Sequence, residues 1–136
     1  NNLKMALEKD PSNTSILFAL GAQYDNLGQV EEAEKSYKKA LEIKPDYFDA
    51  IYNLGALYVN HAARLMTEAN AIPMDKIKEY DAKKAEADAA LEKALPYLEQ
   101  AHQMDPADRN TMVTLKEIYA RKSMLDKVKE MDAKLK

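Results

Sequence analysis

The chain has 136 residues, of which 32% are charged and 46% hydrophobic, and it contains only 3 glycines and 5 prolines. This composition favours helices and supplies enough apolar side chains for a continuous core, which excludes intrinsic disorder. The formal net charge of −3 argues against a general nucleic-acid binder, and the absence of cysteine excludes disulfides and thiolate chemistry. No apolar run approaches the roughly 20 residues of a membrane-spanning helix, so membrane insertion is not expected.

The charge is unevenly distributed along the chain. Seven basic and four acidic residues lie between Lys116 and Lys136, while the rest of the chain is acidic. A basic terminal helix could contact nucleic acid, but lysines near a helix C-terminus also interact favourably with the helix dipole. A solvated helix face is therefore the simpler interpretation of this segment.

An internal repeat runs through the first half of the chain. Leu20, Gly21 and Tyr24 are each followed 34 residues later by the same residue type, and the same offset separates Pro11 from Pro45. A repeat of this period is typical of helical hairpins that stack into a solenoid.

Residues 1–13 are predicted to be the second helix of a repeat whose first helix is missing. Leu3, Ala6 and Pro11 lie at the closing positions of the 34-residue pattern. The chain starts at Asn1 without an initiator methionine, and no signal peptide is visible. We therefore expect it to be processed or cut from a longer protein, with an N-terminal face that a neighbouring repeat would cover.

Residues 14–47 are predicted to form one complete repeat of two antiparallel helices. The first helix presents one apolar face, and Gly28 suits the left-handed residue that ends a helix. Small residues lie where the two helices must approach closely, and large residues fill the space between them. The inner positions are Ile16, Leu17, Leu20, Gly21, Tyr24, Ala33, Tyr37, Ala40 and Leu41, and Pro45 closes the unit.

Residues 48–108 are predicted to form a second repeat that contains an insertion. Ala33 recurs as Ala94 only after 61 positions, which is 27 more than the period. The inserted segment, around residues 60–86, keeps an apolar stripe and is broken only near residues 70–74. We therefore expect both helices to be extended into a hairpin that protrudes by roughly 20 Å, since each helical residue adds about 1.5 Å.

Pro96 falls inside the second helix of this extended repeat. It lacks an N–H and its ring clashes with the carbonyl of Glu92, the residue four positions earlier. A kink or a local break is therefore expected near residues 92–96.

Residues 109–136 are predicted to form a degenerate capping repeat. Met112, Leu115 and Tyr119 continue the apolar pattern 61 residues after their counterparts, but Lys116 replaces the glycine. Such decay is expected of a terminal unit whose outer face meets water.

No set of residues predicts catalysis, a metal site or a cofactor. His61 and His102 are the only histidines and are not spaced as metal ligands, and the three glycines are scattered rather than gathered in a phosphate-binding loop. Both histidines are interpreted as helix-surface residues. An enzyme would need a buried polar cluster that the pattern does not predict, so a non-catalytic protein is expected.

The chain resembles the tetratricopeptide repeat family. Seven positions of the first repeat agree with that family in type and spacing: Leu20, Gly21, Tyr24, Ala33, Tyr37, Ala40 and Pro45. The resemblance implies an all-α, right-handed α-solenoid of antiparallel helix pairs that acts as a protein-protein interaction scaffold. It also implies a concave groove that binds a protein or peptide. The groove positions are Phe18, Ala22, Asp25, Asn26, Tyr52, Ala56, Val59, Asn60, Asn110, Val113 and Glu117.

The resemblance also bears on the class of partner. One subgroup of the family grips the C-terminal carboxylate of heat-shock chaperones with a lysine and arginine clamp, whereas the matching positions here, Phe18, Ala22, Asn110 and Thr114, are uncharged. We therefore expect an extended peptide or partner helix with apolar anchors rather than a chaperone tail. Two alternatives stay open, namely a spacer within a longer array and a self-association segment that uses the hairpin as a docking element.

The stretch from Leu91 to Lys136, with the alanine- and lysine-rich insertion before it, resembles the C-terminal part of exported tetratricopeptide-repeat proteins of Bacteroidetes. Members of that group usually begin with a signal peptide. This second resemblance implies the periplasm or cell envelope rather than the cytoplasm.

Overall fold

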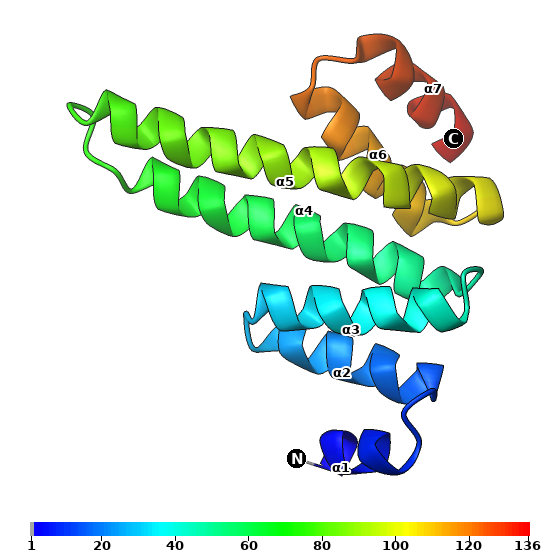
Figure 1. Cartoon of the computed structure of the whole chain (residues 1–136). Helices are drawn as coiled ribbons and strands as arrows, with labels where there is room; N and C mark the ends of the chain where they lie inside the picture. The colour runs from blue at the N-terminus through cyan, green and yellow to red at the C-terminus, as the bar shows by residue number, and fades with distance from the viewer. Residues whose placement is uncertain (1) are drawn as a thin grey trace.

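The computed structural model describes residues 2–136, and Asn1, the first residue of the expected 1–13 segment, lies outside them. The described residues form seven α-helices and no strand (Figure 1). The helices are α1 (Asn2–Lys9), α2 (Thr14–Asn26), α3 (Val30–Ile43), α4 (Phe48–Asn70), α5 (Ile77–Met104), α6 (Arg109–Arg121) and α7 (Leu125–Leu135).

The helices pair in chain order, and the pairs stack on one another. α2 packs against α3, α4 against α5, and α6 against α7, while α3 contacts α4 and α5 contacts α6 between the pairs. α1 packs on α2 at the start of the array. Figure 1 shows this succession from α1 at the blue end to α7 at the red end. The predicted all-α solenoid of antiparallel helix pairs is therefore confirmed.

A left-handed residue follows the first helix of the α2–α3 pair and of the α6–α7 pair. Gly28 has a φ of +75°, and the N–H of the next residue donates to the Tyr24 carbonyl at 2.9 Å. Ser123 has a φ of +59° at the equivalent place, where the Met124 N–H donates to the Tyr119 carbonyl at 2.9 Å. Both turns have the hydrogen bond of a Schellman motif, which closes a helix and turns the chain back.

Two glycines allow the closest approach within the first two pairs. A Cβ atom on Gly21 would lie 2.5 Å from Tyr37 Cε1, and one on Gly55 would lie 2.7 Å from Leu98 Cγ. Tyr37 and Leu98 have no exposed surface, so neither side chain has free space into which to withdraw. Gly55 and Leu98 thus make in the longer pair the contact that Gly21 and Tyr37 make in the shorter one.

α4 and α5 are much longer than the helices of the first pair. They contain 23 and 28 residues, whereas α2 and α3 contain 13 and 14. In Figure 1 they run antiparallel side by side, and their far ends reach beyond α3 to a turn at residues 71–76. Lys83 and Glu68 form an ion pair across this hairpin at 3.3 Å. Residues 70–86 include no fully buried side chain, so few apolar contacts hold the outer end together.

α5 runs as one continuous helix through Pro96, so of the two outcomes expected near residues 92–96 the local break is wrong, while the kink stays a prediction. Pro96 is exposed, so the Glu92 carbonyl that lacks a donor can bind water, which lowers the cost of the missing backbone hydrogen bond. On the other side of the same turns, Ala94 and Leu98 are completely buried. Burial of the inner face therefore outweighs the local preference of proline to end a helix.

Candidate binding groove

The first helices of the three pairs, α2, α4 and α6, lie next to one another. α2 contacts α4, and the Tyr52 hydroxyl on α4 lies 3.5 Å from the Thr114 Oγ1 on α6. The surface that these helices share is called the α2–α4–α6 groove below. It carries the positions that the family resemblance implies for ligand binding.

All eleven expected groove residues are at least partly accessible. Six are half-buried, namely Phe18, Ala22, Asp25, Tyr52, Ala56 and Val59. Five are exposed, namely Asn26, Asn60, Asn110, Val113 and Glu117. Apolar core residues of the same helices, such as Leu17, Leu54 and Leu115, are almost completely buried. The two faces of each helix are therefore clearly separated.

Aromatic side chains gather near the N-terminal ends of α2 and α4. The Phe18 ring centroid lies 5.8 Å from that of Tyr37 and 5.5 Å from that of Tyr47. The Phe48 and Tyr52 rings are stacked, with centroids 6.4 Å apart and planes 15° from parallel. Phe18 therefore contributes to packing as well as to the surface, because its ring is held between two other aromatic side chains.

The Tyr37 hydroxyl lies beneath the groove without a hydrogen-bond partner. Tyr37 has no exposed surface, and its hydroxyl oxygen is buried and unpaired. Burial raises the pKa of Tyr37, the Asn53 side chain lowers it, and the Asp25 carboxylate raises it. The Asn53 side chain therefore lies close to this hydroxyl. A buried polar group left unpaired costs free energy in the folded chain.

The C-terminal half of α2 gives the groove a polar end. Burial raises the pKa of the half-buried Asp25 carboxyl, and the Arg64 guanidinium on α4 opposes that shift. The exposed amides of Asn26 and Asn60 lie on the same two helices. The groove therefore offers aromatic surface at one end and hydrogen-bonding groups of mixed charge at the other.

Several of these groups are absent from the expected set of groove residues. These groups are Tyr47, Phe48, Asn53 and Arg64. Asn53 directly follows the expected Tyr52, whereas Phe48 lies four residues before Tyr52 and Arg64 lies about three helical turns beyond Asn53. The four-residue spacing of Phe48 and Tyr52 could have indicated their stacking, because such residues are neighbours on a helix. The contribution of the Tyr37 hydroxyl could not have been found, because it depends on how α3 packs behind α2 and α4.

The histidines have no ligand-like arrangement. His61 is half-buried on α4, and the His102 Nε2 lies 3.2 Å from the Lys134 Nζ, between α5 and α7. Within residues 2–136, no three histidine, cysteine, aspartate or glutamate side chains are grouped so that they could hold a metal ion. Among the same residues, no helix is both long and apolar enough to cross a membrane.

Comparison with known proteins gives two overlapping family matches. A model described as tetratricopeptide repeat matches residues 2–35, and one described as TPR repeat matches residues 23–61. The peroxisomal targeting signal receptor of Candida albicans is 40% identical over 57 residues, which is 42% of this chain and 10% of that protein. The photosystem I assembly protein Ycf3 of Acaryochloris marina is 39% identical over 54 residues, which is 39% of this chain and 32% of that protein. The chain therefore spans only a minor part of these relatives.

A solved structure is similar over most of the chain. The crystal structure of a TPR repeats protein from Bacteroides fragilis matches with a TM-score of 0.72 and 27% identity. The match covers 88% of this chain and 57% of that protein.

Proposed function

We propose that the chain, a tetratricopeptide-repeat solenoid by its family matches and its fold, binds an extended peptide or a partner helix in the α2–α4–α6 groove. The main support is the row of accessible groove residues that crosses three successive first helices. Such a surface can hold several side chains of one ligand in register, which a single helix cannot. Proteins of this kind generally act as non-catalytic scaffolds, so binding alone is the proposed activity.

The two ends of the groove suit different parts of a ligand. The stacked Phe48 and Tyr52 rings and the Phe18 ring provide a surface for an apolar anchor. Asp25 and Arg64 can hydrogen-bond polar or backbone groups of the ligand. An apolar anchor followed by polar groups therefore fits this surface better than a terminal carboxylate does.

Replacing Val113 by aspartate tests the groove with little effect on the core. Val113 and Ile43 are both 43% exposed, but Val113 lies in the groove and Ile43 lies on α3, outside it. Partners are captured with the intact protein, identified, and titrated by calorimetry against both variants. We expect Val113→Asp to weaken binding about tenfold, because a carboxylate is desolvated against an apolar ligand group. We expect Ile43→Asp to bind normally, and equal affinities of the two variants would contradict groove binding.

Phe18 is less suitable for this test, although it is the largest aromatic side chain expected in the α2 part of the groove. Its ring packs on Tyr37 and Tyr47, so Phe18→Asp would disturb the solenoid as well as the surface. A loss of binding in that variant would not separate the two effects. Thermal unfolding of Val113→Asp and Ile43→Asp provides the matching check that both variants are folded.

Self-association through the hairpin tip is a second candidate function. Met74 and Ile77 are 96% and 65% exposed, and they border a hollow of about 200 Å³ that Ile72, Pro73 and Tyr80 also line. Exposed apolar groups of this kind often mark contact sites. Light scattering at increasing concentration should detect a dimer that the Met74→Ser, Ile77→Ser double variant cannot form. A chain that stays monomeric at every concentration would remove this candidate.

We also propose the periplasm or cell envelope as the location of the protein. The support is the resemblance of residues 91–136 to exported Bacteroidetes proteins and the similarity to the Bacteroides fragilis structure. Fractionation of cells that produce the intact protein tests this proposal. Recovery of the protein in the cytoplasmic fraction alone would contradict it.

A further inference from the structure

A second concave site lies where the hairpin meets the start of α3, away from the α2–α4–α6 groove. A cavity of about 300 Å³ is lined by Val30, Glu31, Glu34, Tyr58, His61, Leu65, Glu86, Ala89, Ala90 and Lys93. A neighbouring hollow of about 370 Å³, over the turn at Gly28 and the first residues of α3, shares Val30, Glu31 and His61 with it. The two hollows together are called the junction cleft.

The floor of the junction cleft is apolar. Leu65 and Ala90 are 7% and 5% exposed, and Val30 packs against the same core cluster. The Tyr58 hydroxyl donates a hydrogen bond to the Glu34 carboxylate, which fixes the phenol ring in the wall between α3 and α4. The cleft therefore has a shaped surface on which the aliphatic part of a ligand can lie.

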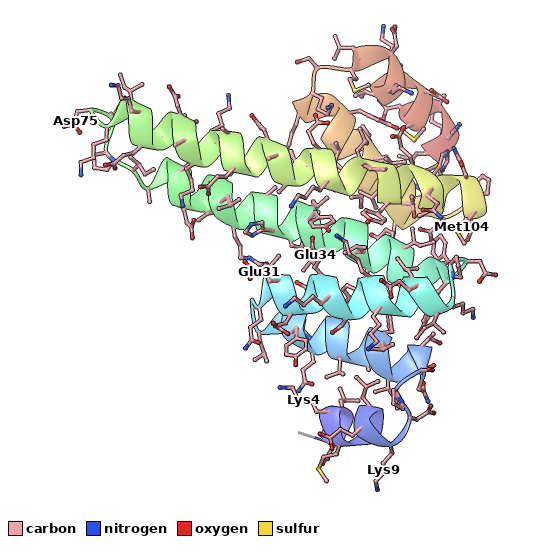
Figure 2. The ribbon with its side chains drawn as sticks, viewed as in Figure 1. Lys4, Lys9, Glu31, Glu34, Asp75 and Met104 are labelled. Carbon is pink, nitrogen blue, oxygen red and sulfur yellow. The ribbon has the colours of Figure 1, made fainter. Side chains whose placement is uncertain are left out.

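The rim of the junction cleft is acidic. Its charged lining residues are four glutamates and one lysine, namely Glu31, Glu32, Glu34, Glu86 and Lys93. Figure 2 shows Glu31 and Glu34 on the side of α3 that faces α4. The Lys93 ammonium lies 5.8 Å from the centroid of the Tyr58 ring. A concave surface with an apolar floor concentrates the negative potential of such a rim.

The four glutamates differ in their partners. Glu32, Glu34 and Glu86 pair with lysines of their own helices, at 3.7, 3.7 and 3.8 Å. In the part of the chain that the structure describes, the Glu31 carboxylate has no ion pair and no side-chain hydrogen bond. It therefore remains available to a cation from outside the chain.

We propose that the junction cleft binds a lysine- or arginine-bearing segment of a partner protein. The aliphatic stem of the basic side chain lies over Leu65 and Ala90, and its charged head reaches Glu31 and Glu86. Long basic side chains combine these two properties, since the stem buries against apolar surface while the head stays near water and carboxylates. An acidic segment or a nucleic acid is repelled by the same rim, so charge complementarity selects a basic partner.

The site depends on the insertion. His61, Leu65 and Glu86 belong to the segment 60–86 that exceeds the repeat period, and Ala89 and Ala90 follow it directly. A repeat of ordinary length would have no wall opposite the first residues of α3. The proposed site is therefore independent of the groove and of the function proposed for it.

Two matched synthetic peptides test the proposal. One is an acetylated and amidated nonapeptide of leucine, alanine and arginine, and the other carries glutamine at each arginine position. Each is titrated into the uniformly ¹⁵N-labelled chain and followed by amide chemical shifts. We expect the arginine peptide to shift Val30, His61, Leu65 and Ala90, and to bind about fivefold more tightly than the glutamine peptide. Added salt should reduce this difference, because it screens the exposed carboxylates.

Variants of the rim provide the second arm of the experiment. Glu31→Gln with Glu86→Gln should weaken binding of the arginine peptide about fivefold. The control, Glu8→Gln with Glu79→Gln, makes the same change of net charge at exposed residues outside the cleft and should bind normally. Binding weakened equally by both double variants would reduce the effect to net charge and overturn the proposal.

An arginine introduced into α5 by substitution tests the position of the site. Ala89 lines the cleft, whereas Ala85 lies one helical turn earlier on α5 and does not line it. Ala89→Arg should place a guanidinium among the glutamates and abolish the peptide-induced shifts, while Ala85→Arg should leave them intact. Three outcomes would each overturn the proposal. The first is equal binding of both peptides, and the second is chemical-shift changes confined to the α2–α4–α6 groove. The third is concentration-dependent changes that place a second copy of the chain in the cleft. Val113→Asp does not alter the cleft, so the two proposed sites can fail separately.

Discussion

Replacing Gly21 by alanine should destabilise the solenoid even though alanine favours helices. The new Cβ would lie 2.5, 2.6 and 2.9 Å from the Tyr37 atoms Cε1, Cδ1 and Cζ. The Tyr37 ring has no exposed surface and packs against Phe18, so it cannot move away without disturbing its neighbours. Overpacking costs about 1–3 kcal/mol, and three atoms of a rigid ring place this case near the upper end. Alanine is more favourable than glycine in a helix by about 1 kcal/mol, so the free energy of unfolding should fall by about 2 kcal/mol in total.

The assay is urea unfolding followed by circular dichroism, in the wild-type chain and in a Tyr37→Leu background. Leucine lacks the ring atoms that approach Gly21, so alanine at position 21 should no longer clash there. In that background we expect Gly21→Ala to be neutral or to stabilise by up to about 1 kcal/mol, because only the propensity term remains. A double-mutant cycle then isolates the contact between the two residues.

Two outcomes would refute this reasoning. If Gly21→Ala costs the same free energy of unfolding in both backgrounds, the Tyr37 ring is not what requires glycine at this position. An unchanged midpoint in the wild-type background would lead to the same conclusion, because it would show that the ring can yield at no cost.

Three further predictions follow from the same structure. Replacing residues 60–86 by a short turn should leave a cooperatively folded array. Its urea m-value should be smaller, because less surface becomes exposed on unfolding. Loss of cooperative unfolding would show that the hairpin is needed for the fold. Within the α4–α5 hairpin, amide hydrogen exchange should be fastest at residues 70–86, which have no fully buried side chain, and uniform protection along α4 and α5 would contradict this. Burial and neighbouring glutamates raise the pKa of Tyr58 and Tyr119 above their ordinary value of 10.0, so these phenols stay protonated in the folded chain while the unfolded chain ionises. The free energy of unfolding should therefore fall as the pH rises above about 10. The double variant Tyr58→Phe, Tyr119→Phe should show a smaller fall. An unchanged dependence of the unfolding free energy on pH would argue against the raised pKa values.

The helix pairs could be predicted from the sequence because their contacts follow from residue size at fixed spacing. Small residues such as Gly21 are expected where two helices approach closely and large residues such as Tyr37 between them, and the structure brings these two into contact. The break expected at Pro96 is wrong because burial of neighbouring residues outweighs the local backbone preference of proline. Proline costs one hydrogen bond on the water-facing side of α5, whereas ending the helix would expose Ala94 and Leu98.

The candidate groove could be predicted only in part. Helix register determines which side of α2 or α4 is accessible, and all eleven expected positions are accessible. The groups beneath and between the helices depend on how pairs stack, which the spacing does not encode. The burial of the Tyr37 hydroxyl and the electrostatic effect of Arg64 on Asp25 are features of this kind. His61, expected on a helix surface, is half-buried there and lines a hollow beside the first turn of α3.

An insertion can lengthen one pair of a stacked array without disturbing its neighbours only if both helices grow by nearly the same amount. With residues 60–86 taken as the insertion, α4 gains residues 60–70 and α5 gains residues 77–86, with the turn at 71–76 between them. Because these additions are almost equal, Gly55 still meets Leu98 and α6 still packs on α5. Growth of one helix alone would move Leu98 away from Gly55 and displace every later helix. New surface therefore arises only at the hairpin and at its base beside α3, and a ligand in the junction cleft can bind without competing for the groove.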